Sequence, residues 1–290
     1  MKRNTGNRNT RRKAVIRKPK KKPSLWSQKL KSYSIVFFVV FLFLGLLYHY
    51  RNGLAYYFSF KTDKVLNSKS ADKRISDVRN FQVLEKNEGK TIGIDVSEYQ
   101  GEIDWSAIGV LEEHYPLRFV FIRATVGNDR LDKRFKENWQ GAKSNKLIRG
   151  AYHYYRPNEN SLEQAELFIK TVILKSGDLP PVLDIEQLPK NQSVERLKIG
   201  LKRWLAKVEA HYKVKPIIYT GEKYYDDFLK EEFSEYLFWI ANYNFYREKM
   251  EDDWLFWQFT EKATVYGIEG NVDVNIYNGD LQQLQYITKE

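Results

Sequence analysis

Hydrophobic and polar positions change their period along the chain from residue 91 onward, where strand-like stretches alternate with helix-like ones. Short, nearly continuous runs of aliphatic and aromatic residues are typical of strands buried on both faces. Eight such runs occur, at Thr91–Val96, Arg118–Ala124, Leu147–Tyr155, Pro181–Ile185, Pro216–Thr220, Tyr236–Asn242, Leu255–Thr260 and Val272–Tyr277. They predict eight strands within residues 91–290.

Apolar residues at helical spacing predict helices between the earlier strands. The first helix is expected to follow Asp132 as its N-cap, and the second to begin with Ser161 and Gln164 as a capping box. A third, amphipathic helix is predicted from Val194 to Val208. Strands that alternate with helices in this way predict a parallel sheet covered by helices.

The number of strands favours a closed barrel. Eight strands in 200 residues suit an α/β fold of the TIM-like (β/α) type. No long helical pattern separates the last three strands, so we expect an irregular barrel with fewer helices in its last third. A doubly wound open sheet is the alternative, but no Gly-rich phosphate loop follows any strand.

An uncharged apolar stretch at residues 33–50 lies between basic flanks. As a helix it spans about 27 Å, which matches the hydrocarbon core of a bilayer. We therefore predict a transmembrane anchor at 33–50, preceded by a basic cytoplasmic tail at 1–32. A cleaved signal peptide is the alternative, although no convincing small-x-small cleavage site follows the apolar run.

This topology predicts a single-pass protein of the cytoplasmic (inner) membrane. Its N-terminus is expected inside, and the folded domain on the periplasmic or cell-wall side. Residues 51–90 are polar and lysine-rich, which predicts a tether with one or two helical turns. A small stalk domain is the alternative there. The barrel domain is expected to occupy residues 91–290.

The positive net charge of +11 comes from the N-terminal tail. Residues 1–31 hold 13 Lys and Arg and no acidic residue, whereas the remaining residues hold 35 basic and 37 acidic side chains. The folded domain is thus nearly neutral, and we expect no nucleic-acid partner. Attraction to anionic lipids accounts for the tail. The sequence has no cysteine, which excludes disulfides.

Two carboxylates end the predicted strand at Pro181–Ile185. Side chains two apart on a strand share a face, so Asp184 and Glu186 are expected to point the same way, about 6–7 Å apart along the strand. Two neighbouring carboxyl groups raise one pKa, which leaves one acid and one carboxylate near neutral pH. Glycosidases use such a pair. Two solvated carboxylates at a strand end are the alternative interpretation.

Further polar and aromatic residues gather at or near the ends of the predicted strands, where barrel enzymes place their sites. Aromatic rings with polar tips suit sugars, which offer an apolar face and hydroxyl edges. Besides Asp184 and Glu186, the candidates are the carboxylates Asp95 and Asp273 and the substrate-binding residues Tyr154, Tyr155, Tyr219, Trp239, Asn242 and Gln258.

Seven motifs in order resemble glycoside hydrolase family 25, the Chalaropsis-type lysozymes. They lie at 93–101 (GIDVSEYQG), 119–125 (FVFIRAT), 150–155 (GAYHYY), 183–186 (LDIE), 236–243 (YLFWIANY), 257–260 (WQFT) and 270–275 (GNVDVN). The resemblance covers about residues 91–285. It implies an irregular (β/α) barrel that hydrolyses the β-1,4 bond between N-acetylmuramic acid and N-acetylglucosamine in peptidoglycan. One departure is Val126, where the family usually has Glu after Ala-Thr.

The resemblance implies roles for the carboxylates. Glu186 is expected to be the general acid, and Asp184 to orient the substrate's 2-acetamido group for attack on the anomeric carbon. A direct carboxylate nucleophile, or inversion through water held by Asp95 or Asp273, is the alternative. No metal or cofactor is expected, because the histidines lack ligand spacing.

The expected partners are peptidoglycan glycan strands and, through the apolar helix, the membrane. Two other classes of function remain open from the sequence. One is a non-catalytic peptidoglycan-binding protein on the same fold, and the other is a membrane-tethered interaction protein that works through its basic tail.

Overall fold

The computed structural model describes residues 25–49, 71–112 and 114–290, and the chain divides into two units at residues 51 and 52. The described part of the first unit is one helix, α1 (Leu25–His49). Its side chains from Tyr33 to His49 are exposed. Among the described residues, no helix has the length and apolarity needed to cross a membrane. The predicted span of 33–50 ends at Tyr50, which lies outside the described residues. Residues 1–24 of the predicted tail at 1–32 and residues 51–70 of the predicted tether also lie outside them.

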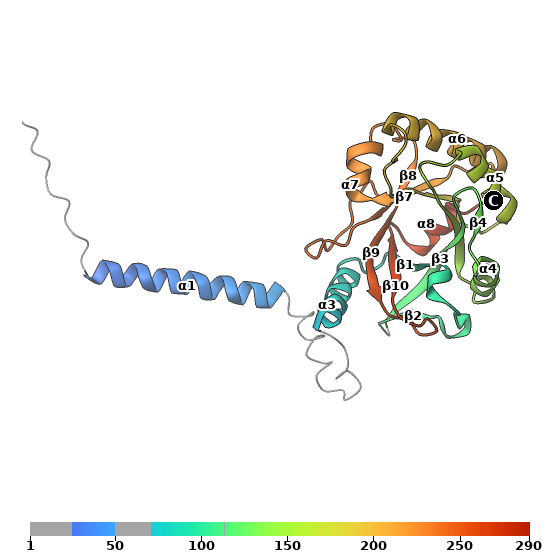
Figure 1. The fold of residues 1–290 in the computed structure, drawn as a ribbon. Coiled ribbons are helices and arrows are strands. Elements are labelled where there is room, and N and C mark those ends of the chain that lie inside the picture. Colours follow the sequence, from blue (N-terminus) through green and yellow to red (C-terminus); the bar gives the residue numbers. More distant parts are fainter. Residues whose placement is uncertain (1–24, 50–70, 113) are drawn as a thin grey trace, which may run out of the picture. The chain divides into compact units, whose positions relative to one another are not determined.

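The second unit is built on a closed barrel (Figure 1). Its strands are β1 (Thr91–Val96), β3 (Tyr115–Val126), β5 (Ile148–Tyr154), β6 (Val182–Asp184), β7 (Ile217–Gly221), β8 (Leu237–Ala241), β9 (Phe256–Ala263) and β10 (Val272–Tyr277). The sheet follows the order β1-β10-β9-β8-β7-β6-β5-β3, and pairing of β1 with β3 closes it. Two short strands, β2 (Val110–Leu111) and β4 (Arg130–Leu131), pair with β3 outside the barrel.

Strand direction is mixed at one place. The pairs from β1 through β3, β5, β6, β7, β8 and β9 are parallel. The last strand, β10, is antiparallel to both β9 and β1. The prediction of an α/β barrel is therefore confirmed, but an all-parallel sheet is not what forms. In the described chain no helix lies between β9 and β10. A short connection joins the two strands, and β10 runs in the direction opposite to β9.

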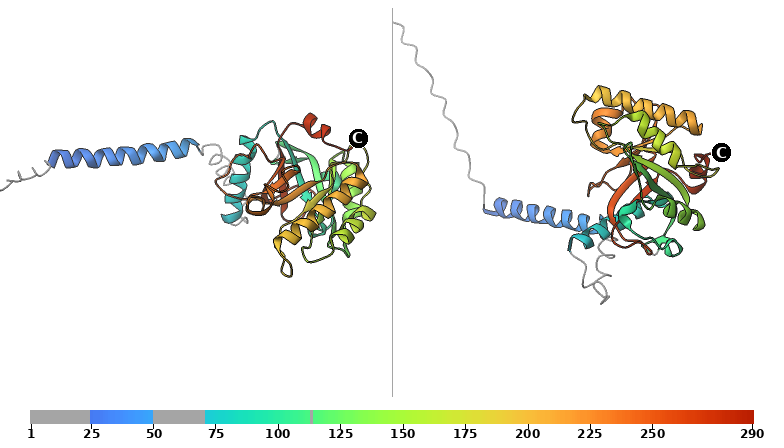
Figure 2. Two further views of the ribbon diagram at one scale, coloured as in Figure 1. Left: turned by 90° about the horizontal axis from the view of Figure 1, so that it is seen from above. Right: turned by 45° about the vertical axis from the view of Figure 1, so that its right-hand side comes forward.

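Helices cover the outside of the barrel between its earlier strands (Figure 2). They are α4 (Phe135–Ser144), α5 (Ser161–Thr171), α6 (Val194–Tyr212) and the short α7 (Glu222–Tyr224), which continues into a π-helical turn at Tyr225–Leu229. Short 3-10 turns lie at Glu98–Gln100 and Trp105–Ala107, and α8 (Leu281–Tyr286) follows β10. The scarcity of helices in the last third agrees with the sequence prediction.

Two helix starts differ from the expected caps. The N-cap of α4 is Arg134 rather than Asp132. Asp132 accepts hydrogen bonds from the Arg123 side chain and from the backbone N–H of Glu98. The N-cap of α5 is Asn160 rather than Ser161. Gln164 is buried and bonds to His153 and to the backbone of Arg156. Asp132 also keeps a local hydrogen bond, because its Oδ1 accepts from the backbone N–H of Arg134 at 3.0 Å, whereas Gln164 bonds to His153 on β5.

The hydrophobic core has two layers. An inner layer fills the barrel, where Phe121 stacks on Trp239 with ring centroids 4.5 Å apart and meets Phe256 edge to face. A larger layer packs between the barrel and its helices, around Trp204 and Phe168. Large aromatic side chains on the inner face leave little room below the barrel mouth, so the site must lie above them.

One helix lies where the sequence predicted a tether. Residues Ala71–Lys86 form α3, which packs along β9 (Figure 1). Val83 and Leu84 are fully buried there, and Arg79 is only 6% exposed. Arg79 donates hydrogen bonds to the carbonyl oxygens of Phe259 (2.5 Å) and Asn244 (3.0 Å). The folded unit therefore begins before Thr91, because polar groups of α3 find backbone partners on the barrel.

Candidate active site

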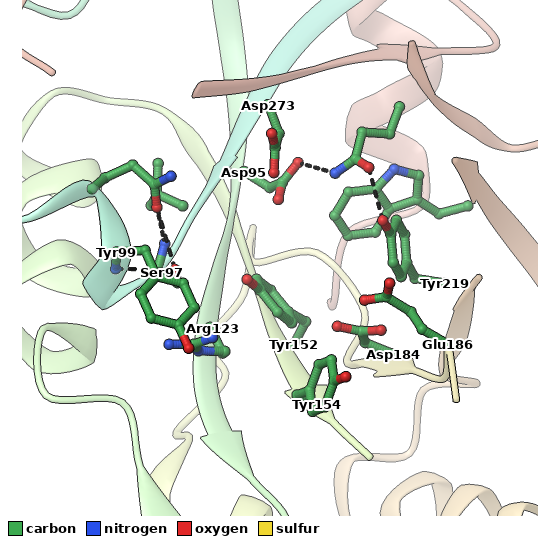
Figure 3. A pocket seen from close by; sticks show the side chains of 14 residues that line it. Asp95, Ser97, Tyr99, Arg123, Tyr152, Tyr154, Asp184, Glu186, Tyr219 and Asp273 are labelled. Carbon is green, nitrogen blue, oxygen red and sulfur yellow. Dashed lines mark hydrogen bonds between the residues drawn. The ribbon is translucent and has the colours of Figure 1, made fainter. Parts of the chain in front are cut away.

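A pocket of about 200 Å³ opens at the barrel mouth, at the carboxyl ends of the parallel strands (Figure 3). All four predicted carboxylates line it, as two pairs: Asp95 with Asp273, and Asp184 with Glu186. The remaining lining residues are Val96, Ser97, Tyr99, Gln100, Arg123, Tyr152, Tyr154, Tyr219, Trp239 and Gln258.

The first carboxylate pair comes from neighbouring antiparallel strands. Asp95 near the end of β1 stands directly opposite Asp273 near the start of β10. Burial raises the pKa of Asp95 to about 6, although hydrogen bonds to it act in the opposite direction. Burial and repulsion from Asp95 raise the pKa of Asp273 to about 9. At neutral pH the pair therefore holds one proton, on Asp273, and one negative charge, on Asp95.

The carboxylate of Asp95 is held by two side-chain amides. Its Oδ2 accepts hydrogen bonds from Gln258 Nε2 (2.7 Å) and Asn275 Nδ2 (2.8 Å). The hydroxyls of Tyr219 and Tyr243 both donate to Gln258 Oε1, which turns the amide nitrogen toward Asp95. Asn275 is fixed in the same way, because its Oδ1 accepts from the indole of Trp239 at 2.8 Å. The network orients Asp95 and favours its ionised form.

The second carboxylate pair lies at the end of β6, where Asp184 is the last residue of the strand and Glu186 follows two residues later. Asp184 is buried, and no donor in the described part of the chain reaches its Oδ1. Burial, followed by repulsion from Glu186, raises the pKa of Asp184 well above its usual range. Glu186 is exposed at the pocket opening, yet desolvation by the surrounding protein raises its pKa, against a hydrogen bond to Asp184 that lowers it. Both pKa shifts favour a carboxyl group that keeps its proton in this pair.

Tyrosine side chains and one cation complete the walls. Tyr152 lies between the two carboxylate pairs, and Tyr154 lies beside Asp184 (Figure 3). The guanidinium of Arg123 sits 4.5 Å from the ring centroid of Tyr99, a side chain that is 74% exposed at the rim. Arg123 is itself held by an ion pair with Asp132 at 2.8 Å. The buried cation supports an exposed aromatic ring that an incoming ligand can reach.

The structure brings most of the predicted site residues together. Asp95, Asp184, Glu186, Asp273, Tyr154, Tyr219, Trp239 and Gln258 all line the pocket. Two predicted residues do not. Tyr155 is buried in the outer core layer against α6, because successive residues of a strand face opposite sides. Asn242 supports the loop after β8, where its side chain bonds to Glu222 and to the backbone N–H of Asn244.

Six lining residues are not among the sequence candidates: Val96, Ser97, Tyr99, Gln100, Arg123 and Tyr152. Tyr152 lies two residues before Tyr154 on the same strand, so the two-residue period could have identified it. Arg123 follows the inward-facing Phe119 and Phe121 by the same rule. Tyr99 lies in a 3-10 turn, for which strand periodicity gives no signal. Val126 is buried, pairs with Arg130 and does not line the pocket.

Within the described residues, no group of three or more His, Asp or Glu side chains is arranged to hold a metal ion. The buried His153 bonds to Thr125 Oγ1 at 2.7 Å and stacks on Trp204, outside the pocket. Burial lowers the pKa of His153 to about 3, so the ring is neutral and serves the outer core layer.

We expect replacement of Asp273 by Asn to stabilise the protein increasingly as pH rises. The folded-state pKa of about 9 lies above the unfolded value, so the stability that protonated Asp273 supplies is present at low pH and is lost as pH rises toward 9. Asn cannot ionise and avoids this loss. Thermal denaturation from about pH 5 to about pH 9 should show the Tm advantage of Asp273→Asn growing by about 3 °C or more.

The control for this experiment is Asp104→Asn. Hydrogen bonds from Ser106 lower the pKa of Asp104, the opposite direction, so its substitution should give no such growing advantage. A constant Tm difference between Asp273→Asn and the wild type across the range would show that Asp273 ionises as freely as in the unfolded chain.

A closed barrel with paired carboxylates and aromatic walls at its mouth defines a glycoside hydrolase. The family model "Glycosyl hydrolases family 25" matches residues 94–268. This chain belongs to that family and acts as a muramidase.

Two relatives each match about two thirds of the chain. The chain is 41% identical over 197 residues to the protein YegX of Escherichia coli K12, with 67% of this chain and 71% of YegX covered. It is 32% identical over 207 residues to lysozyme M1 of Streptomyces globisporus, with 66% of this chain and 69% of that protein covered.

Solved structures show the same barrel. The lysozyme of Streptomyces coelicolor superposes with a TM-score of 0.62 at 28% identity, covering 70% of this chain and 99% of the other. A family 25 glycosyl hydrolase of Bacillus anthracis gives a TM-score of 0.62 at 29% identity, with 70% and 95% covered. The helix α3 lies outside the residues that the family model matches.

Proposed function

We propose that the chain is a membrane-anchored muramidase in which Glu186 is the general acid and the substrate's acetamido group is the nucleophile, oriented by Asp184. The reaction is hydrolysis of the β-1,4 bond between N-acetylmuramic acid and N-acetylglucosamine in peptidoglycan. The observation that carries this mechanism is the Asp184–Glu186 pair, in which Asp184 is buried and its Oδ1 is reached by no described donor.

An acetamido N–H is a suitable partner for that oxygen. Buried acceptors normally find a donor, because leaving one unpaired costs about 1–3 kcal/mol. A substrate amide that donates to Asp184 removes this cost and turns its carbonyl oxygen toward the anomeric carbon. The aromatic walls formed by Tyr152 and Tyr154 suit the apolar face of the same sugar.

The proton of this pair then has a defined path. When Asp184 accepts the amide N–H, its own proton moves to Glu186, which is the group exposed to the leaving sugar. Glu186 donates it to the glycosidic oxygen as the bond from that oxygen to the anomeric carbon breaks. The acetamido oxygen forms the new bond to that carbon, which gives a cyclic oxazolinium ion. Its positive charge is balanced by Asp184.

Water completes the turnover. The Glu186 carboxylate takes a proton from a water molecule, whose oxygen bonds to the anomeric carbon and opens the ring. The product keeps the configuration of the substrate, because two displacements occur at one carbon. Asp95 remains ionised and held by two amides, so it adds negative charge beside the cationic sugar without changing position.

Analysis of the cleaved ends tests the reaction. The full-length protein, incubated with purified peptidoglycan, should release fragments whose new reducing ends are N-acetylmuramic acid, identified after borohydride reduction by mass spectrometry. Reducing ends at N-acetylglucosamine would contradict the bond assignment. Binding to peptidoglycan without new ends would support the non-catalytic alternative.

The membrane anchor is supported by the sequence. Residues 33–49 carry no charge, and a tail with 13 Lys and Arg and no acidic residue precedes them. We expect the protein to stay in the membrane fraction after a high-salt wash, and a reporter fused after Glu290 to be active only outside the cytoplasmic membrane. Release by salt, or a shortened soluble form, would overturn the anchor. Cytoplasmic reporter activity would overturn the wall-side location.

A further inference from the structure

A second cavity, of about 170 Å³, lies between the helix α3 and the mouth of the barrel. Its walls come from α3, from the loop after β8 and from the outer end of β9. Its lining residues include Asn80, Tyr243, Phe245 and Thr260, and Arg79 also lines it. The helix α3 that forms one wall precedes the residues matched by the family model.

The cavity adjoins the catalytic pocket through one side chain. Tyr243 lines the cavity, and its hydroxyl donates to Oε1 of Gln258, which lines the catalytic pocket and holds Asp95. Thr260, two residues after Gln258 on β9, belongs to the wall of the cavity. A linear polymer that occupies the catalytic pocket can therefore continue over Tyr243 into the space beside α3.

The buried side chain of Asn80 lacks a partner. It is 1% exposed, and within the described residues neither its Nδ2 nor its Oδ1 makes a hydrogen bond. A buried amide without partners costs free energy in the folded protein. Since Asn80 lines the cavity, a ligand with one acceptor and one donor would satisfy both atoms.

The opposite wall is aromatic and already in place. Tyr243 is 44% exposed and Phe245 is 43% exposed, so both rings are partly free to contact a ligand. Arg79 holds the two walls together through its hydrogen bonds to the carbonyls of Asn244 and Phe259. These bonds use the guanidinium of Arg79 inside the protein. Besides the aromatic faces and the Asn80 amide, the exposed side chains of Glu261 and Lys262 line the cavity.

We propose that this cavity is a distal subsite for the glycan strand, which binds an N-acetylated sugar beyond the pair that flanks the cleaved bond. The inference rests on the muramidase function proposed above. An acetamido group supplies one N–H and one carbonyl oxygen, which match the two unpaired atoms of Asn80, and the sugar ring packs on Phe245 and Tyr243. The subsite lengthens the binding groove and makes the protein prefer long glycans.

Kinetics on peptide-free glycans of two lengths test the subsite. The full-length protein is compared on a tetrasaccharide and an octasaccharide of alternating N-acetylglucosamine and N-acetylmuramic acid. For Asn80→Leu and Phe245→Ala, we expect the ratio of the octasaccharide KM to the tetrasaccharide KM to rise about three- to tenfold, with kcat on the octasaccharide unchanged. Asn80→Leu should keep its Tm, because it removes an unpaired buried amide.

The control is Tyr266→Ala. Tyr266 is 75% exposed and lines neither this cavity nor the catalytic pocket, so its substitution should leave the KM ratio unchanged. An unchanged ratio in both cavity variants would overturn the subsite. A ratio that changes only with glycans carrying their peptides would assign the cavity to the peptide stem and also overturn it.

A binding measurement keeps this inference separate from the catalytic proposal. In Glu186→Gln, the dissociation constants of the two glycans are measured by calorimetry with and without Asn80→Leu. A weaker affinity for the octasaccharide alone supports the subsite even if the wild type cleaves nothing. Equal effects on both glycans, or none, contradict it whatever the catalytic outcome.

Discussion

Glu186→Gln is expected to abolish turnover of peptidoglycan while the fold persists. Gln is nearly isosteric with Glu but has no acidic proton to give to the leaving oxygen. General acid catalysis contributes about 10²–10⁴-fold, and the same carboxyl group also activates water, so kcat should fall by at least that range. Glu186 is exposed at the pocket opening and lies outside the helices and strands, so its replacement should not disturb packing.

Release of reducing ends measures the loss, and thermal denaturation measures the fold. Glu195→Gln is the matched control, because Glu195 is an exposed glutamate in the first turn of α6 and does not line the pocket. It should keep wild-type kcat. If Glu186→Gln retained near-wild-type kcat with an unchanged Tm, the acid would have to be another pocket carboxyl group.

Peptidoglycan without N-acetyl groups is expected not to be cleaved. If the acetamido oxygen is the nucleophile, de-acetylation of the sugar at the cleaved bond removes the attacking atom, and the loss should exceed that of a binding contact. A carboxylate nucleophile would tolerate de-acetylation far better. The measurement is the rate on N-acetylated and on N-de-acetylated peptidoglycan, with the first product anomers followed by NMR.

Asp184→Asn tests the same route from the side of the protein. Asp184 is expected to balance the oxazolinium charge, and loss of a fixed electrostatic partner of this kind costs about 10²–10³-fold in kcat. The variant should stay folded, because a neutral amide replaces a buried carboxyl group whose pKa is already raised. Asp184→Asn with high kcat would exclude the acetamido-orienting role.

Product stereochemistry separates the remaining alternatives. Retained configuration together with no activity on the de-acetylated glycan supports acetamido attack. Inverted product, or equal rates on both glycans, would contradict it and would give the water-activating role to Asp95 or Asp273. Asp95 is the better placed of the two for a base, because its pKa of about 6 leaves it ionised at neutral pH.

The barrel could be predicted from the sequence because each of its strands is a separate run of apolar residues. Thr91–Val96 and Val272–Tyr277 were predicted with the bounds that β1 and β10 have in the structure, and the other six strands differ by a few residues at their ends. Buried strands need continuous apolar residues whatever their neighbours are, so this signal is local. The Asp184–Glu186 pair was found for the same reason, since a period of two fixes a shared face.

The direction of β10 was not available from its own residues. Asp273 lies near the start of its strand, and in an all-parallel barrel that end would face away from the mouth. It reaches the pocket because β10 runs antiparallel to β1, which places Asp273 opposite Asp95. Strand direction depends on pairing partners and on the length of the connection, and neither is written in the apolar pattern of a single strand.

The sequence by itself determined the strands, the carboxylate pair of β6 and the family, because each depends on residues close together in the chain. Only the tertiary structure decided that α3 belongs to the folded unit. Its pattern looked polar because Arg79 and Asn80 lie on its buried side. Burial of Arg79 is tolerated because the carbonyls of Asn244 and Phe259, more than 160 positions away, accept its hydrogen bonds. Partners at that distance along the chain exist only once the barrel has closed.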